Sequence, residues 1–134
     1  MPTLQSLGAA WAPRVLSLLR IMAALLFLQH GLQKLAGFPP MAGGAGPAAF
    51  TLLWFAGVIE LVGGVLVLLG LFTRPAAFVM SGEMAVAYFL FHAPRNFFPA
   101  INGGDAAILF CFVFLYLAAA GPGPWSIDHG RGAD

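Results

Sequence analysis

Residues 15–36 read VLSLLRIMAALLFLQHGLQKLA. Apolar residues fall on nearly every side of this stretch, whereas a helix on the surface of a soluble protein is apolar on one face only. About 20 predominantly apolar residues are enough to cross the hydrocarbon core of a bilayer as a helix. Arg20 lies inside the run and no A-x-A cleavage site follows it, which argues against a signal peptide. The stretch therefore predicts a first membrane-spanning helix.

Three further apolar blocks follow, each bounded by glycine or proline. They predict helices over residues 48–72, 75–93 and 105–120. Pro75 suits the first turn of a helix, and the sequence GPGP at 121–124 ends the fourth block. We therefore expect an all-α fold: one membrane domain over residues 1–134, built as a four-helix transmembrane bundle.

The composition agrees with a chain whose solvent is lipid. Of its 134 residues, 60% are hydrophobic and 8% are charged, and its mean hydropathy is +0.91. A soluble domain carries about 25% charged residues. The formal net charge of +1 offers no basic face for nucleic acid. The single cysteine, Cys111, rules out an intrachain disulfide and a multi-cysteine metal site.

The cations in the predicted loops favour one orientation. Arg14, Arg74 and Arg131 fall on the side that holds both termini, and Lys34 and Arg95 fall on the other. Loops rich in lysine and arginine face the cytoplasm. We therefore expect a multi-pass protein of the cell membrane with both termini cytoplasmic.

Five ionisable side chains lie within the predicted spans: Arg20, His30, Lys34, Glu60 and Glu83. A charge in a span costs about 2.5–3.5 kcal/mol on insertion scales, and such residues usually face the bundle and pair with one another. Because Arg20, Glu60 and Glu83 fall at similar depths on three helices, we expect them to form one ion-paired group. Such a group either works as a site or only holds the helices in register.

A second polar group is expected at the outer ends of the helices, near His30 and Lys34. It comprises Arg95, Asn102 and Asp105. An acid such as Asp105 is favoured at a helix N-terminus by the helix dipole, and Arg95 is expected to reach lipid headgroups. His92 lies opposite Glu83 on an ideal helix and is expected to face a loop or headgroups.

Six pieces of the chain, taken in order, carry a family resemblance: residues 19–20, 30–34, 60–64, 70–77, 102–105 and 121–128. They read LR, HGLQK, ELVGG, GLFTRPAA, NGGD and GPGPWSID. In this order they resemble the DoxX family of small four-helix membrane proteins. Where that family often has Glu after the paired glycines, this chain has Asp105. Related proteins are linked to quinone-dependent sulfur oxidation, as the small membrane subunit of a thiosulfate:quinone oxidoreductase, and to membrane complexes that handle oxidative or thiol stress. The resemblance thus implies a redox-associated membrane protein.

The first functional hypothesis is a quinone-interacting membrane subunit. An apolar slot for the quinone is expected among four aromatic residues, namely Phe27, Phe55, Phe89 and Phe91. His30, Lys34 and Glu60 are the expected polar ends of that slot. The chain has no cysteine pair, flavin motif or iron–sulfur spacing, so electrons would have to come from a partner protein or a diffusible donor. A haem held by His30 and His92 is disfavoured, because the two histidines differ in depth.

Two hypotheses from other classes remain open. One is a non-enzymatic scaffold or assembly factor for partner membrane proteins, which the small size and the glycines of the second block suit. The other is a small carrier, which four helices would build only as a homo-oligomer. Recovery of a stable partner from native membrane would favour the scaffold.

Overall fold

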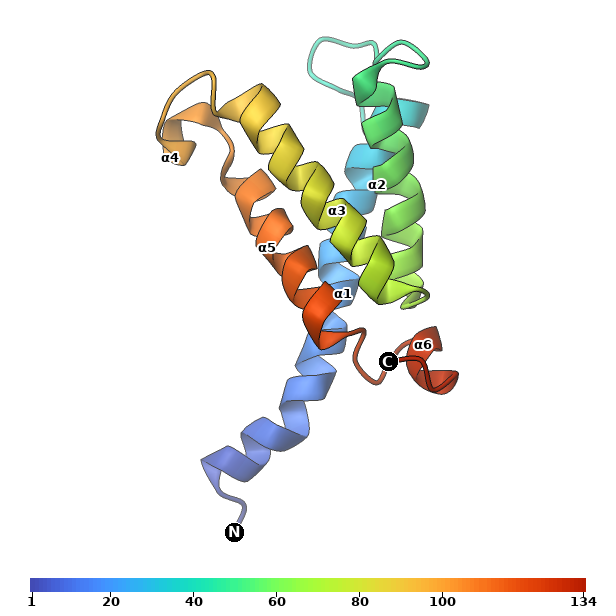
Figure 1. Ribbon diagram of the computed structural model, residues 1–134, viewed down its shortest axis with the longest axis vertical. Helices are drawn as coiled ribbons and strands as arrows, with labels where there is room; N and C mark the ends of the chain where they lie inside the picture. The colour runs from blue at the N-terminus through green and yellow to red at the C-terminus, as the bar shows by residue number, and fades with distance from the viewer.

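The computed structural model describes all 134 residues, and its regular elements are all helices. The fold is therefore all-α, as the sequence predicts. The elements are α1 (Leu4–Ala36), α2 (Leu52–Leu69), α3 (Thr73–Ala87), the π-helical turn η1 (Tyr88–His92), α4 (Pro99–Asn102), α5 (Asp105–Ala120) and α6 (Ile127–Gly130) (Figure 1). η1 continues α3 directly.

Capping residues explain where the first two helices begin and end. Thr3 and Thr51 precede α1 and α2, and each side-chain oxygen accepts the backbone N–H three residues further on. Gly37 and Gly70 end these helices with φ of 66°, a left-handed conformation that glycine adopts at low cost. Helix α1 is therefore longer than the expected 15–36, and α2 is shorter than the expected 48–72.

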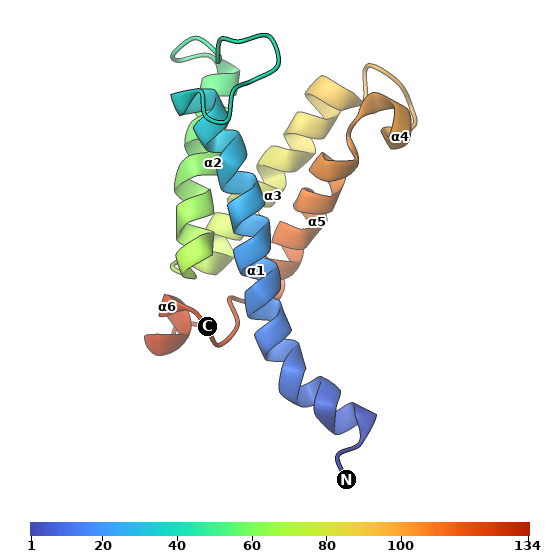
Figure 2. The same ribbon diagram turned by 180° about the vertical axis from the view of Figure 1, so that it is seen from behind.

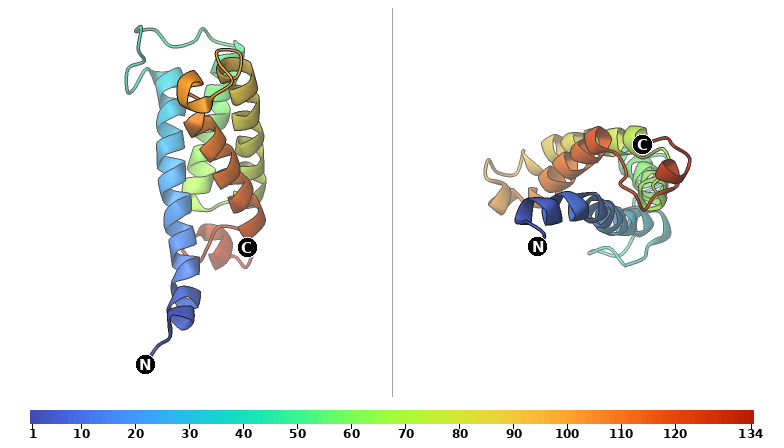
Figure 3. Two further views of the ribbon diagram at one scale, coloured as in Figure 1. Left: turned by 90° about the vertical axis from the view of Figure 1, so that its left-hand side faces the viewer. Right: turned by 90° about the horizontal axis from the view of Figure 1, so that it is seen from below.

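The long helices associate as two antiparallel pairs, α1 with α2 and α3 with α5. Figures 1 and 2 show that the pairs meet at the end of the molecule that holds both termini and diverge toward the opposite end. The 33 residues of α1 correspond to about 50 Å of helix. Its N-terminal turns consequently project alone beyond the other helices (Figure 3).

Glycines allow α1 and α2 to approach closely. A Cβ added to Gly31 would lie 2.7 Å from the backbone nitrogen of Leu61, and one added to Gly64 would lie 2.9 Å from a methyl group of Leu28. A Cβ on Gly63 would lie 2.7 Å from the sulfur of Met80 on α3. Small residues of this kind let helix backbones pack together in lipid, where no hydrophobic force drives helices together.

Large apolar side chains point outward from all four long helices. Leu25 is 44% exposed, Val62 54%, Phe78 65% and Phe112 64%. Exposed apolar surface on this scale marks contact with a membrane or another protein. By length and composition, α1 and α2 can each cross a bilayer. The exposed side chains of α1 and α2 therefore form a surface suited to lipid.

The C-terminal tail returns beneath the helices and caps α3. The Asp128 carboxylate accepts the backbone N–H groups of Phe72 and Thr73 at 3.0 and 2.9 Å. Burial alone would raise the pKa of the Asp128 carboxyl, but these hydrogen bonds and the charge of Arg131 outweigh burial and hold that pKa below its usual range. At the neighbouring helix end, Arg74 donates to carbonyl oxygens in the last turn of α5. The tail thus ties together the end where the two helix pairs meet.

Candidate functional site

A cavity of about 630 Å³ lies between the two helix pairs. Its apolar wall comes from all four long helices and includes Phe27, Leu53, Ile59, Met84, Leu90 and Phe110. Six polar or ionisable side chains share it: His30, Lys34, Glu60, Glu83, His92 and Arg95. A mostly apolar cavity with a few convergent polar groups is the usual form of a small-molecule site.

Lys34 and Glu60 form an ion pair in this cavity. The Lys34 Nζ lies 2.7 Å from both Oε1 and Oε2 of Glu60. The Glu60 side chain is 3% exposed and that of Lys34 17%. Gly57 makes room for the pair, because a Cβ there would lie 2.9 Å from the Cβ of Lys34. The close α1–α2 packing therefore places a satisfied ion pair in the cavity wall.

Glu83, on α3, faces the same cavity without a partner. Both of its carboxylate oxygens are buried and neither has a hydrogen-bond partner. Glu60 and Lys34 both lie near enough for their charges to act on Glu83. Buried polar groups in proteins are normally paired, so a buried carboxyl group without a partner in a cavity wall makes Glu83 a candidate for contact with a ligand.

The π-helical turn brings His92 into the cavity wall that Glu83 also lines, which corrects the expectation that it lies opposite Glu83, although its ring also contacts the loop before α5, as expected. A π turn takes more residues per turn than an α-helix, so His92 is rotated less far around the axis than regular α-helical spacing requires. Its Nδ1 lies 3.1 Å from the carbonyl oxygen of Asn102. Arg95 follows η1 and also lines the cavity, although it is exposed. These two residues stand near the outer end of the cavity, beyond Glu83 along the chain.

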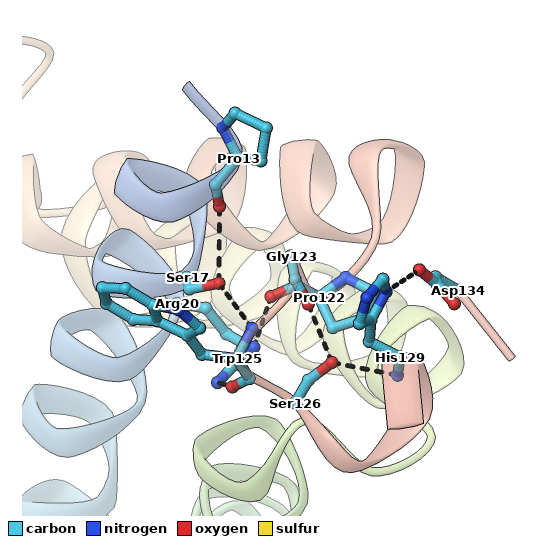
Figure 4. A network of polar contacts seen from close by, with 9 residues as sticks. All are labelled: Pro13, Ser17, Arg20, Pro122, Gly123, Trp125, Ser126, His129 and Asp134. Atoms are coloured by element: carbon cyan, nitrogen blue, oxygen red, sulfur yellow. Dashed lines mark hydrogen bonds and ion pairs between the residues drawn. The ribbon is translucent and has the colours of Figure 1, made fainter. Parts of the chain in front are cut away.

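Arg20 lies apart from the two carboxylates, which corrects the expected Arg20–Glu60–Glu83 group. The guanidinium, 1% exposed, donates to the backbone carbonyl oxygens of Pro122 and Trp125 in the C-terminal tail. Ser17, one turn earlier, accepts the backbone N–H of Trp125 at 3.1 Å (Figure 4). Arg20 therefore holds the tail against α1 and takes no part in the cavity.

Asn102 and Asp105 also lie outside the cavity. Asn102 is buried and organises the loop before α5: its side chain donates to the carbonyl oxygen of Asn96 at 2.9 Å and accepts the N–H of Gly104 at 2.7 Å. Asp105 is exposed in the first turn of α5, where the helix dipole favours an acid. The outer-end group of Arg95, Asn102 and Asp105 is thus divided, and only Arg95 reaches the cavity.

Three of the four aromatic side chains expected in the cavity line it. Phe27, Phe55 and Phe91 take part, whereas Phe89 is 68% exposed and absent from the wall. Phe110 on α5, which was not among the expected aromatic residues, also lines the cavity and packs against Phe27 with ring centroids 5.4 Å apart. Its position on the same face as Ala106 and Ala107, at helical spacing, was the available signal.

The fold and these features define a class of protein: an all-helical membrane protein with ionisable groups enclosed between its helices. Residues 15–93 match the DoxX family, more than half of the chain, so the chain belongs to that family. The family match supports the resemblance seen in the sequence.

The relatives are membrane proteins or proteins without an assigned activity. An uncharacterized protein of Haemophilus influenzae is 46% identical over 123 residues, covering 89% of this chain and 92% of its own length. The uncharacterized membrane protein Rv3486 of Mycobacterium tuberculosis is 30% identical, covering 96% of this chain and 88% of its own. The inner membrane protein YqjF of Escherichia coli is 31% identical, with coverage of 82% and 86%. No solved structure matches the chain significantly. Membrane location therefore rests on the family and on these relatives.

Proposed function

We propose that this protein is a membrane subunit that binds a lipophilic quinone in the cavity between its helix pairs and works with a partner protein that carries the redox centre. The observation that carries the proposal is the unpaired carboxyl group of Glu83 in a mostly apolar cavity. A quinone has an apolar body and two carbonyl oxygens that need hydrogen-bond donors. The cavity supplies matching surfaces for both parts.

Several features of the cavity support a quinone rather than a soluble metabolite. Its wall is mostly hydrophobic and includes Phe27, Phe91 and Phe110, and aromatic side chains provide large flat apolar contact surfaces. The polar groups come from α1, α2, α3, η1 and the segment after η1, which suits orientation of a head group. When bound, a quinone would supply the electron-accepting chemistry, and this chain would bind and orient it and exclude water.

We further propose that α1, α2, α3 with η1, and α5 all cross the membrane as a four-helix bundle with both termini in the cytoplasm. Helix α3 has 15 residues and η1 adds five, together about 30 Å, which matches the hydrocarbon core. Arg14, Arg74 and Arg131 belong to the end that holds both termini, in agreement with the distribution of positive charge in membrane proteins. On this arrangement the cavity lies nearer the outer leaflet.

A scaffold role is the alternative, and one observation favours it. A second, almost wholly apolar groove of about 450 Å³ runs between α2 and α3, with Val62, Leu66 and Pro75 among its lining residues. A helix of a partner membrane protein would fit such a groove. Quinone binding with no recoverable partner would count against the scaffold, and a stable partner without quinone binding would count for it.

Quinone binding can be tested by replacing two alanines of α5 separately, one in the cavity and one outside it. Ala106 lines the cavity and Ala120 lies in the last turn of the same helix outside it, and both are exposed. Ala106→Phe should fill the cavity, whereas Ala120→Phe adds the same bulk elsewhere. Decylubiquinone at 100 times its Kd should stabilise the purified wild type by about 2.7 kcal/mol.

The expected result is a raised unfolding temperature with decylubiquinone for the wild type and Ala120→Phe, and a much smaller shift for Ala106→Phe. Equal shifts in both variants would show that decylubiquinone binds elsewhere. An absence of any shift in the wild type would refute the proposal. A Soret band in the purified protein would identify haem as the ligand of the cavity instead, because His30 and His92 both line it.

A further inference from the structure

Glu83 differs from the other buried ionisable groups in having no partner of any kind. Glu60 is bonded through both oxygens to Lys34, Arg20 donates to two backbone carbonyl oxygens, and Asp128 accepts two backbone N–H groups. The two oxygens of Glu83 are buried and accept nothing. Burying an ionised carboxylate without a partner carries a penalty of several kcal/mol, which protonation removes.

The nearest cation, Lys34, is already bonded to Glu60. Lys34 directs its ammonium group at both oxygens of Glu60, 2.7 Å from each. With all three groups ionised, Lys34, Glu60 and Glu83 together carry one surplus negative charge inside the membrane. The surplus disappears when the three residues bind one proton, and Glu83 is the member without another bond.

The remaining ionisable groups around Glu83 do not bond to it. His30 on α1, His92 on η1 and the exposed Arg95 beyond η1 are the other ionisable side chains lining the cavity. None of them forms a hydrogen bond or ion pair with Glu83. Helix α5 contributes apolar side chains only, such as Ala107 and Phe110.

We propose that Glu83 is a neutral carboxylic acid in the resting protein and that its O–H donates a hydrogen bond to a carbonyl oxygen of the ligand. An apolar site can keep a carboxylic acid neutral near pH 7 so that it serves as a donor. The cavity then offers a hydrogen-bond donor to a carbonyl oxygen of the oxidised form of a quinone. The ligand assignment rests on the proposed function, whereas the proton on Glu83 can be measured with no ligand present.

The proton is tested by chemical labelling of the intact protein in detergent. Dicyclohexylcarbodiimide is apolar and reacts with protonated carboxyl groups in apolar surroundings, and the adduct is located by mass spectrometry. We expect an adduct at Glu83, with a rate that falls as pH rises. The ion-paired Glu60 and the exposed Asp105 should react little. Labelling of Glu60 in preference to Glu83, or a rate at Glu83 that does not depend on pH, would overturn the proposal.

The hydrogen bond to the ligand is tested with two substitutions at Glu83. Glu83→Gln keeps an N–H donor but cannot titrate, so it should bind decylubiquinone at all pH values with no pH dependence. Glu83→Leu removes the donor and should bind about tenfold more weakly at low pH. Wild-type affinity should fall as pH rises, and Asp105→Asn, a matched acid outside the cavity, should behave as the wild type does.

The two measurements separate this inference from the proposed function. A pH-dependent adduct at Glu83 without decylubiquinone binding would support the protonated state of Glu83 and refute the proposal of a quinone ligand. If Glu83→Gln binds decylubiquinone with the pH dependence of the wild type, the proposal of a quinone ligand stands, but the pH dependence belongs to another group. That result contradicts the proposal for Glu83.

Discussion

Replacement of Lys34 by methionine tests the electrostatics of the cavity directly. Lys34→Met keeps the length and apolar stem of the side chain but removes the cation that faces Glu60. Glu60 is only 3% exposed, so its carboxylate would remain in a low-dielectric wall with no partner. Removing one member of a buried ion pair costs about 3–5 kcal/mol.

The cost of removing Lys34 has an upper limit that depends on pH. Without Lys34, the Glu60 carboxylate can bind a proton and so avoid the free-energy cost of being buried as an unpaired charge. For a glutamate with an ordinary pKa of about 4.3, protonation at pH 7 costs about 3.7 kcal/mol, since each pH unit corresponds to about 1.4 kcal/mol. At pH 5 the same step costs about 1 kcal/mol. We therefore expect Lys34→Met to be destabilised by about 3–4 kcal/mol at pH 7 and by about 1 kcal/mol at pH 5.

The matched control is the double variant Lys34→Met with Glu60→Met. Replacing both members of a buried ion pair with apolar residues is often neutral or stabilising, so the double variant should lie within about 1 kcal/mol of the wild type at both pH values. Stability would be measured by denaturant titration in mixed micelles, followed by helical circular dichroism. Equal destabilisation of the single and double variants, unchanged between pH 7 and pH 5, would refute the reasoning, because the loss would then come from packing.

Two further predictions concern the helix contacts. Gly31→Ala should destabilise the protein by about 1–3 kcal/mol, since its Cβ would lie 2.7 Å from the backbone of Leu61, while Gly82→Ala on α3, with open space around it, should be neutral or stabilising in the same denaturant titration. Asp128→Asn should lose about 1–2 kcal/mol at pH 7. Because folding lowers the pKa of Asp128, its contribution is present above the unfolded value and disappears as pH falls through the folded value, so wild type and variant should converge in acid. A gap between wild type and Asp128→Asn that is constant with pH would contradict the assignment.

The sequence alone was enough for the elements and their environment. Apolar blocks bounded by Gly37 and Gly121 mark where α1 and α5 end, because glycine and proline interrupt helices through local backbone geometry, whereas α2 ends at Gly70, inside the block expected over 48–72. Low charge and high hydropathy indicate lipid, because solvent preference is a property of composition. The residues that face inward, such as Lys34, Glu60 and Glu83, also follow from helical periodicity, since a charged group avoids lipid wherever its helix lies.

The tertiary structure decided which of these groups meet. From their depth and helical face, Arg20 was expected to contact Glu60 and Glu83. In the structure, Arg20 instead donates to the backbone carbonyl oxygens of Pro122 and Trp125 in the tail. Backbone carbonyl oxygens are the same at every position, so no residue pattern marks them as partners. His92 likewise reached the cavity through a π turn, which alters the rotation per residue that every periodicity argument assumes. Local sequence determines the helices and their inward faces, whereas the partner of each buried charge depends on which helices pack together and how closely, and that geometry exists only in the folded chain.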